Sequence, residues 1–158
     1  MLFLRMISCY AQIMRRYGHP ADAKQTYTDR PGVYGIIISQ RGVLLTHQAK
    51  PYSELQLPGG GIDPGESSLT ALHREVIEET GWRINPLRRL GVYQRYTYMP
   101  DYDLHARKVC HVFVARAVRR LADPTEPHHT AHWVSPSLAI DCLASEGDAA
   151  FLRDFING

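Results

Sequence analysis

The stretch that decides the fold is LPGGGIDPGESSLTALHREVIEETGW, residues 57–82. Its second half predicts a helix over residues 68–80, with Ser67 as the N-cap and Gly81 as the left-handed residue that ends it. One face of this helix is apolar, because apolar or small residues recur three or four positions apart. The residues of this face are Leu69, Leu72, Val76 and Thr80.

A second face of the predicted helix gathers carboxylates. Glu75, Glu78 and Glu79 lie at positions i, i+3 and i+4, where side chains are neighbours and like charges repel. Only Arg74 lies among them, so a hard divalent cation such as Mg²⁺ or Mn²⁺ would relieve the repulsion with oxygen ligands. The residues alone leave a solvated acidic helix face as an equal alternative.

The residues before the helix favour a ligand. Glycines at 59, 60 and 61 allow the backbone to approach a ligand closely. The turn at residues 63–65, Asp-Pro-Gly, returns the chain to the start of the helix. Glu66 then comes within reach of Arg74, which predicts an ion pair between the loop and the helix.

The same stretch resembles the signature of the Nudix hydrolases, the MutT-like nucleoside diphosphate-X pyrophosphohydrolases, at every specified position: Gly60-x5-Glu66-x7-Arg74-Glu75-Val76-x-Glu78-Glu79-x-Gly81-Trp82. Trp82 stands where an aliphatic residue is more usual in that family. The resemblance covers about residues 30–157. It implies an α/β fold, a Nudix-type α/β/α sandwich with a mixed β-sheet, and hydrolysis of a pyrophosphate bond in a nucleoside diphosphate joined to another group X.

The resemblance also implies roles for single residues. Glu75, Glu78 and Glu79 would hold one to three Mg²⁺ or Mn²⁺ ions with the help of the Gly60 carbonyl. Glu66, Arg74 and Gly81 would be structural. The divalent metal would activate a water for attack, and a carboxylate would take its proton.

The base implied for this proton is Glu78, Glu79 or an acid on a later loop. Glu126 is the candidate on that loop, with a solvated loop acid as the alternative. The nearby His128, His129 and His132 are expected to be residues of a non-functional loop rather than zinc ligands, because Pro127 and the following strand argue against a helical His pair.

Two residues after the helix are candidates for substrate binding. Arg95 could hold a phosphate, and Tyr98 could stack a base. The alternative is that they are simply residues on the two faces of a strand. Tyr98 and Pro100 lie near positions that different Nudix groups use for dinucleoside polyphosphates and for ADP-ribose, so they do not distinguish between these substrates or an oxidised nucleoside triphosphate.

Composition excludes several classes of protein. The 158 residues include 18 Lys and Arg and 16 Asp and Glu, for a net charge of +2, which argues against a protein that coats DNA or a membrane surface. Residues 60–82 carry −4 and the remainder +6. Three scattered cysteines suggest no disulfide framework, and no apolar run reaches the ~20 residues of a membrane span, so a cytoplasmic protein is expected.

The expected organisation is an N-terminal extension over residues 1–27, helical or poorly ordered, and a Nudix domain over residues 28–158. The partner would be a small-molecule nucleotide, and the apolar N-terminal segment could pack across a homodimer. A catalytically inactive Nudix domain that binds a nucleotide as a sensor is the alternative function. Hydrolysis at the 5′ end of RNA is disfavoured, because only 3 of the 18 cations are lysine.

The remaining expected elements follow the same order along the chain. Strands are predicted at residues 33–38, 43–46, 92–98, 109–118 and 133–134, and helices at residues 136–143 and 148–156.

Overall fold

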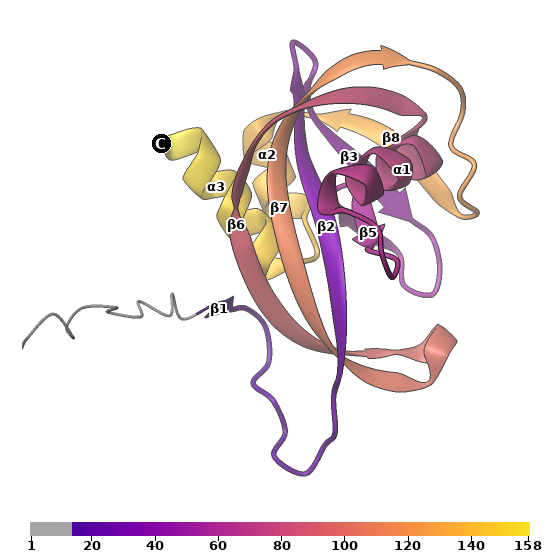
Figure 1. Ribbon diagram of the computed structural model, residues 1–158. Helices are drawn as coiled ribbons and strands as arrows, with labels where there is room; N and C mark the ends of the chain where they lie inside the picture. The colour runs from indigo at the N-terminus through magenta and orange to yellow at the C-terminus, as the bar shows by residue number, and fades with distance from the viewer. Residues whose placement is uncertain (1–13) are drawn as a thin grey trace, which may run out of the picture.

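A computed structural model describes residues 14–158 and shows one large curved sheet with helices on both faces (Figure 1). The helices are α1 (Ser68–Thr80), α2 (Pro136–Cys142) and α3 (Glu146–Asn157), with a 3₁₀ turn at Pro100–Tyr102. The strands are β1 (Arg15–Arg16), β2 (Thr28–Ser39), β3 (Gly42–Gln48), β4 (Glu54–Gln56), β5 (Gly59–Gly61), β6 (Trp82–Met99), β7 (Leu104–Arg120) and β8 (His129–Val134).

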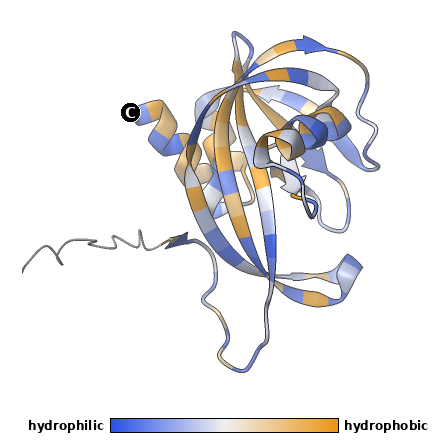
Figure 2. Ribbon diagram, viewed as in Figure 1, coloured by the Kyte–Doolittle hydropathy of each residue, from blue (hydrophilic) through white to orange (hydrophobic). Residues whose placement is uncertain are grey.

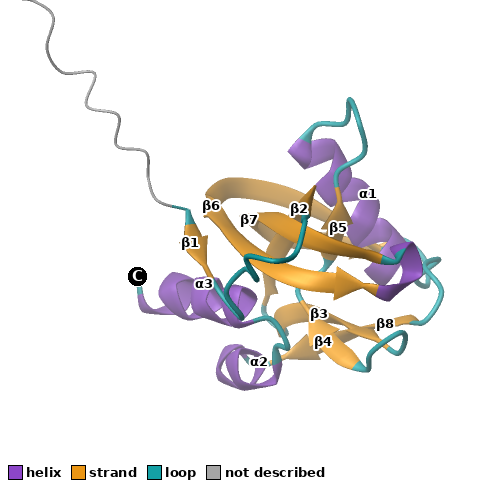
Figure 3. Cartoon of the chain, turned by 90° about the horizontal axis from the view of Figure 1, so that it is seen from below, coloured by secondary structure: helices purple, strands orange, loops and turns teal. Residues whose placement is uncertain are grey.

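The sheet is mixed. Its order is β1-β6-β7-β2-β3-β4, with β5 paired to β2 and β8 paired to β3. The central pair, β2 and β7, is parallel from Thr28 opposite Ala106 to Ile38 opposite Arg116, whereas β6 and β7 form an antiparallel pair. Helix α1 covers one face and helices α2 and α3 cover the other (Figure 3). This arrangement confirms the predicted α/β/α sandwich with a mixed sheet.

Two apolar cores lie on the two faces of the sheet. On the α1 side, Val33 and Ile37 of β2 pack with Leu72 and Val76. On the opposite side, Ile36 packs with residues of β3, β7, α2 and α3. Figure 2 shows the hydrophobic colour in the helix-covered half of β2 and the hydrophilic colour at its other end. The polar residues at this end of β2 therefore lie outside both apolar cores.

Helix α1 begins and ends as predicted. The Ser67 hydroxyl accepts a hydrogen bond from the Thr70 amide at 3.1 Å, and Gly81 has a φ of 72°. Three residues of the predicted apolar face, Leu72, Val76 and Thr80, are buried, whereas Leu69 is 45% exposed. Glu79 is buried as well.

The predicted strands and helices are all present, but β6 is much longer than the predicted strand at residues 92–98. Its first half contains irregularities between Arg83 and Ile84, Pro86 and Arg88, and Arg89 and Gly91. The second and third each place an extra residue in β6, Leu87 and Leu90, which shifts the alternation of its side chains between the two faces. The period-2 pattern that identifies a strand is therefore lost over residues 82–91.

The described part of the N-terminal segment joins the domain as an added strand. Residues 15 and 16 pair in parallel with Tyr93 and Gln94 of β6, and the Tyr17 amide donates to the Gln94 carbonyl at 3.0 Å. Residues 17–27 then form a loop without a helix. Of the extension predicted for residues 1–27 as helical or poorly ordered, residues 1–13 lie outside the described residues. Within residues 14–158, no helix is long and apolar enough to cross a membrane.

Candidate active site

The three glutamates of α1 differ in exposure. The side chain of Glu79 is 7% exposed, that of Glu75 is 15% exposed and that of Glu78 is 36% exposed. The Gly59 amide donates to Glu79 Oε2 at 3.1 Å, and the Gly60 backbone lies directly against the Glu75 carboxyl group. Strand β5 therefore contacts two of the three carboxylates of α1, those of Glu75 and Glu79.

Arg74 connects the loop to the helix and confirms the predicted ion pair. Its Nε and one terminal nitrogen donate to the two oxygens of Glu66 at 2.9 and 2.8 Å. Its guanidinium also donates to the Gly61 carbonyl at 3.0 Å, to Glu75 at 2.7 Å and to Glu78 at 3.4 Å. Hydrogen bonds from Arg74 and from the Asp63 amide lower the pKa of Glu66 to about 2. Arg74 therefore orders the loop and restrains two of the three helix glutamates.

The acidic cluster carries negative charge that no neighbouring cation fully neutralises. Burial raises the pKa of Glu79 well above its ordinary value, despite the hydrogen bond from Gly59, and nearby carboxylates raise it further. Burial also raises the pKa of Glu75, although Arg74 opposes this shift. Two desolvated carboxylates with raised pKa values indicate a place that favours an added cation.

Glu126 belongs to the same cluster. The amides of Thr125 and Glu126 both donate to the Glu78 carbonyl at 2.8 Å, and the Leu121 amide donates to the Gly81 carbonyl at 2.8 Å. These bonds attach the loop after β7 to the C-terminal end of α1. The negative charge of Glu126 raises the pKa values of Glu75 and Glu79, so the loop brings a fourth carboxylate to the helix acids.

The donor set fits a hard divalent cation. In residues 14–158, no three Asp, Glu, His or Cys side chains converge into a ready-made metal site. The helix glutamates are instead hydrogen-bonded to other groups: Glu75 and Glu78 accept from Arg74, and Glu79 accepts from the Gly59 amide. The available ligands are all oxygens with unneutralised charge, which suits Mg²⁺ or Mn²⁺ better than a softer metal.

His129 was expected to lie in a non-functional loop, but it begins strand β8 and lies beside the acids. Its Nδ1 lies 2.9 Å from the Thr46 hydroxyl and 3.7 Å from Glu79 Oε1, and burial lowers its pKa. The pairing of β8 with β3 brings it there, and no local pattern around residue 129 indicates that pairing. His132 instead contacts the Thr130 hydroxyl at 2.9 Å, and His128 is exposed.

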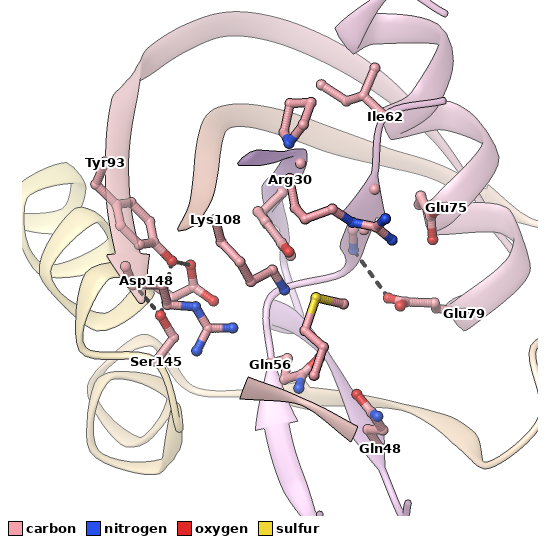
Figure 4. Close-up of a pocket in the computed structure, with 18 of the residues that line it drawn as sticks. Arg30, Gln48, Gln56, Ile62, Glu75, Glu79, Tyr93, Lys108, Ser145 and Asp148 are labelled. Atoms are coloured by element: carbon pink, nitrogen blue, oxygen red, sulfur yellow. Dashed lines mark hydrogen bonds between the residues drawn. The ribbon is translucent and has the colours of Figure 1, made fainter. Parts of the chain in front are cut away.

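A cavity of about 620 Å³ extends from the acids across the sheet (Figure 4). Arg30 and Lys108 lie between its two ends. They are direct neighbours in the register of β2 and β7, where like charges repel. Among residues 14–158, neither of them forms a salt bridge, and each lies over a ring instead: Arg30 lies 4.6 Å from the Tyr102 ring centre and Lys108 5.7 Å from that of Tyr34. Such an uncompensated pair of cations suits a phosphate group.

The far end of the cavity is a polar network. The Tyr93 hydroxyl donates to Asp148 Oδ1 at 2.7 Å and lies 2.9 Å from the Ser145 hydroxyl (Figure 4). Gly147 leaves room for the Tyr93 ring, because a Cβ there would overlap it. Arg95 lines this end as well. The cavity therefore has an acidic end at Glu75 and Glu79 and a far end that contains both the cation Arg95 and the carboxyl group of Asp148.

The sequence candidates are distributed unevenly around this cavity. Glu75, Glu79, Gly60 and Arg95 line it, while Glu78 lies beside it in contact with Arg74. Tyr98 lies outside the lining, and its hydroxyl donates to Asp103. This position does not support the predicted stacking of a base on Tyr98.

The acids come from one continuous stretch, residues 59–80, but the opposite wall comes from separate parts of β2, β6, β7 and α3. The residues of that wall that sequence reasoning missed are Arg30, Lys108, Ser145 and Asp148. No local sequence pattern indicates them, because they lie in or beside β2, β7 and α3 and come together only when these elements pack.

Comparison with known proteins agrees with this architecture. The model of the NUDIX domain matches residues 28–155. A protein of Bacillus subtilis strain 168 named putative 8-oxo-dGTP diphosphatase is 33% identical over 127 residues, which are 80% of each chain. An RNA pyrophosphohydrolase of Pectobacterium carotovorum strain PC1 is 38% identical over 39% of this chain and 35% of its own.

A solved structure shows the same fold. The MutT protein of Methanosarcina mazei Go1 superposes with a TM-score of 0.66 at 23% identity, over 83% of this chain and 95% of its own. The family model spans most of the chain and includes every element around the cavity. The chain therefore belongs to the NUDIX domain family, as a Nudix hydrolase.

Proposed function

We propose that this protein hydrolyses a pyrophosphate bond in a nucleoside triphosphate or another nucleoside diphosphate-X, with Mg²⁺ or Mn²⁺ as cofactor, and that residues 28–158 carry the activity. The proposal rests on one cavity that Arg30 and Lys108 line together with Glu75 and Glu79. Among the described residues, neither cation has a carboxylate partner. A polyphosphate could engage the cations directly and reach the acids through a shared divalent metal.

The residues have separable roles in this reaction. Glu75, Glu78 and Glu79, with the Gly60 carbonyl, would hold the metal, which when bound neutralises phosphate charge and makes water more acidic. Arg30 and Lys108 would orient the phosphates. Arg74, held by Glu66, would keep the glycine strand and the helix together.

Glu78, Glu79 and Glu126 are the candidates for the general base. Burial raises the pKa of Glu79 in the metal-free protein, which favours uptake of a proton by this carboxylate. Glu126 is carried by a loop that is bonded to the end of α1 and influences the pKa of Glu79. If Glu126 is a metal ligand, Glu126→Gln will raise the Mg²⁺ concentration needed for half-maximal activity. If it is the base, the same variant will lower kcat at saturating Mg²⁺.

The substrate class proposed is a free nucleotide rather than an RNA end. The relative named putative 8-oxo-dGTP diphosphatase matches this chain over 80% of both lengths, whereas the RNA pyrophosphohydrolase matches over less than half of either. The sensor alternative has less support, because all of the acids implied by the family signature are present.

The test is a panel of ribonucleotide and deoxyribonucleotide triphosphates, 8-oxo-dGTP, ADP-ribose, a dinucleoside polyphosphate and a 5′-triphosphorylated RNA. Each would be incubated with Mg²⁺ or Mn²⁺, and the products identified by mass. We expect cleavage of a free nucleotide that EDTA stops reversibly and that Glu79→Gln abolishes. Full activity of Glu79→Gln in the presence of EDTA would refute the metal-dependent reaction.

A further inference from the structure

The far end of the cavity contains two buried groups of opposite charge that are not paired with one another. Asp148 is 3% exposed, and the Nε of Arg95 is buried without a hydrogen-bond partner among the described residues. Both side chains line the cavity. Among residues 14–158, no salt bridge joins the Arg95 guanidinium to Asp148, although each charge influences the pKa of the other group.

This arrangement is costly unless a third group bridges the pair. A buried donor without a partner loses its hydration without replacement, and a guanidinium presents its donors as a planar fork. A buried carboxylate close enough to influence that guanidinium would ordinarily close the gap and pair with it. The space between the two groups therefore suits the edge of a planar ligand. Such an edge would accept hydrogen bonds from Arg95 and donate hydrogen bonds to Asp148.

The surrounding hydrogen bonds fix the carboxylate in place. Asp148 Oδ1 accepts from the Tyr93 hydroxyl at 2.7 Å, and the Asp148 amide donates to the Ser145 hydroxyl at 3.3 Å, as part of the N-terminal cap of α3. With the Tyr93 donor and this cap in place, the carboxylate keeps acceptor capacity for a donor of a ligand but little freedom to move toward Arg95.

The positions of Arg30 and Lys108, the cations proposed to bind phosphate, indicate which part of the substrate Arg95 and Asp148 would contact. Lys108 and Arg30 lie between the acids and the Tyr93–Asp148 network (Figure 4). If the phosphates occupy the acidic end, the nucleoside extends toward Asp148. This step rests on the proposed function.

We propose that Arg95 and Asp148 form a base-reading subsite that selects a nucleobase with two adjacent acceptors beside a donor. Two parallel donors of an arginine match the O6 and N7 acceptors of guanine, and N3 and O2 of cytosine form the equivalent pair. Asp148 then accepts from the cytosine amino group or from the N1–H and amino groups of guanine. Adenine has no two adjacent acceptors on one edge, and in uracil N3–H separates the two carbonyls.

The shared chemistry is therefore that of cytosine or guanine nucleotides, and a comparison of CTP, GTP, ATP and UTP distinguishes them. Values of kcat/KM would be measured for all four with Mg²⁺. Equilibrium binding of their methylene-bridged, non-hydrolysable analogues would be measured by calorimetry. We expect CTP or GTP to exceed both ATP and UTP by roughly 5- to 100-fold, the range for one good bidentate base contact.

Two variants and two controls separate reading of the base from structural support. Arg95→Gln and Asp148→Asn should each reduce the preference to less than about 3-fold. Arg116→Gln is the control for a lost arginine, since Arg116 is exposed on β7 and does not line the cavity. Asp141→Asn is the control for a lost carboxylate, since Asp141 is exposed on α2 and does not line the cavity. Both controls should keep the ratio among the four nucleotides.

Equal values for the four nucleotides, or a preference for ATP or UTP, would overturn the proposal. So would a preference that survives both Arg95→Gln and Asp148→Asn, or one that Arg116→Gln or Asp141→Asn abolishes as well. The wild-type comparison decides the matter even if a variant fails to fold. Selective binding of the analogues without any hydrolysis would refute the proposed function and leave the subsite supported, while hydrolysis without selectivity would do the reverse.

Discussion

Gly60 lies against the carboxyl group of Glu75, so closely that a Cβ at position 60 would come within 2.6 Å of the Glu75 carboxyl carbon. Gly60→Ala should therefore displace Glu75 and lower kcat/KM on the order of 100-fold, as expected for misplacement of a catalytic group by about 1 Å. Gly61→Ala is the matched control, because a Cβ at position 61 would meet no atom within 4 Å.

Steady-state kinetics with a saturating metal would measure both variants, and circular dichroism would verify their folding. Equal losses in Gly60→Ala and Gly61→Ala would show that the glycine strand is sensitive to substitution in general. In that case the close approach to Glu75 would not explain the effect.

Glu79→Gln should stabilise the metal-free protein at alkaline pH. Burial raises the pKa of Glu79, so the folded state binds a proton that the unfolded chain has already released, and the contribution of Glu79 to stability falls as pH rises above about 4.5. In EDTA at pH 8, we expect the variant to melt roughly 2–4 °C or more above the wild type, the shift for about 1 kcal/mol in a domain of this size.

Calorimetry at pH 5 and pH 8 would show the difference shrinking at the lower pH. Added Mg²⁺ should raise the melting temperature of the wild type more than that of Glu79→Gln, because the metal stabilises the folded state only where it binds. Asp141→Asn, an exposed acid on α2, is the control and should show neither effect. A Glu79→Gln protein less stable than the wild type at pH 8 would contradict this account.

Glu66 should have the opposite pH dependence. Arg74 lowers the pKa of Glu66 to about 2, so the ionised carboxylate contributes stability that is fully present above the ordinary value of about 4.5. That contribution is lost as pH falls from about 4.5 to 2. Urea unfolding of the wild type and Glu66→Gln should give a free-energy difference that is constant from pH 5 to pH 7 and declines toward pH 2. A difference that does not change with pH would indicate that packing, rather than charge, makes the contribution.

Arg30→Gln and Lys108→Gln should each weaken the binding of phosphate. We expect KM to rise roughly 10-fold in each, the effect of losing one charged hydrogen bond worth about 1.5 kcal/mol. The control is Arg116→Gln, because Arg116 is exposed on the same strand as Lys108 and does not line the cavity. Initial rates against nucleotide concentration measure the effect, and a similar loss in Arg116→Gln would instead indicate a general effect of net charge.

Helix α1 and its acids could be predicted because their determinants are local. The cap at Ser67, the left-handed Gly81 and the spacing of the glutamates all lie within one continuous stretch. The reach of Arg74 to Glu66 follows from the same stretch, since a turn joins the loop to the helix. Of the predicted apolar face, only Leu69 is exposed, and the sequence alone did not indicate that Glu79 would be buried.

The opposite wall could not be predicted because it depends on which strands pair. Arg30 meets Lys108 only through the parallel register of β2 and β7, which are separated by β3 to β6 in the chain. Asp148 reaches Tyr93 only when α3 packs across β6. In the sequence, each of these residues is an ordinary polar residue at the start of a helix or in a strand.

The division of the cavity into a continuous acidic half and a scattered opposite half has a consequence for engineering. Under the proposed function, the reaction would depend on a continuous segment of about two dozen residues, which could be kept intact. The choice of nucleotide would depend on single positions in β6 and at the start of α3, outside that segment. Libraries restricted to positions 93, 95, 145 and 148 should therefore redirect the enzyme to new nucleotides while its hydrolytic chemistry is inherited unchanged.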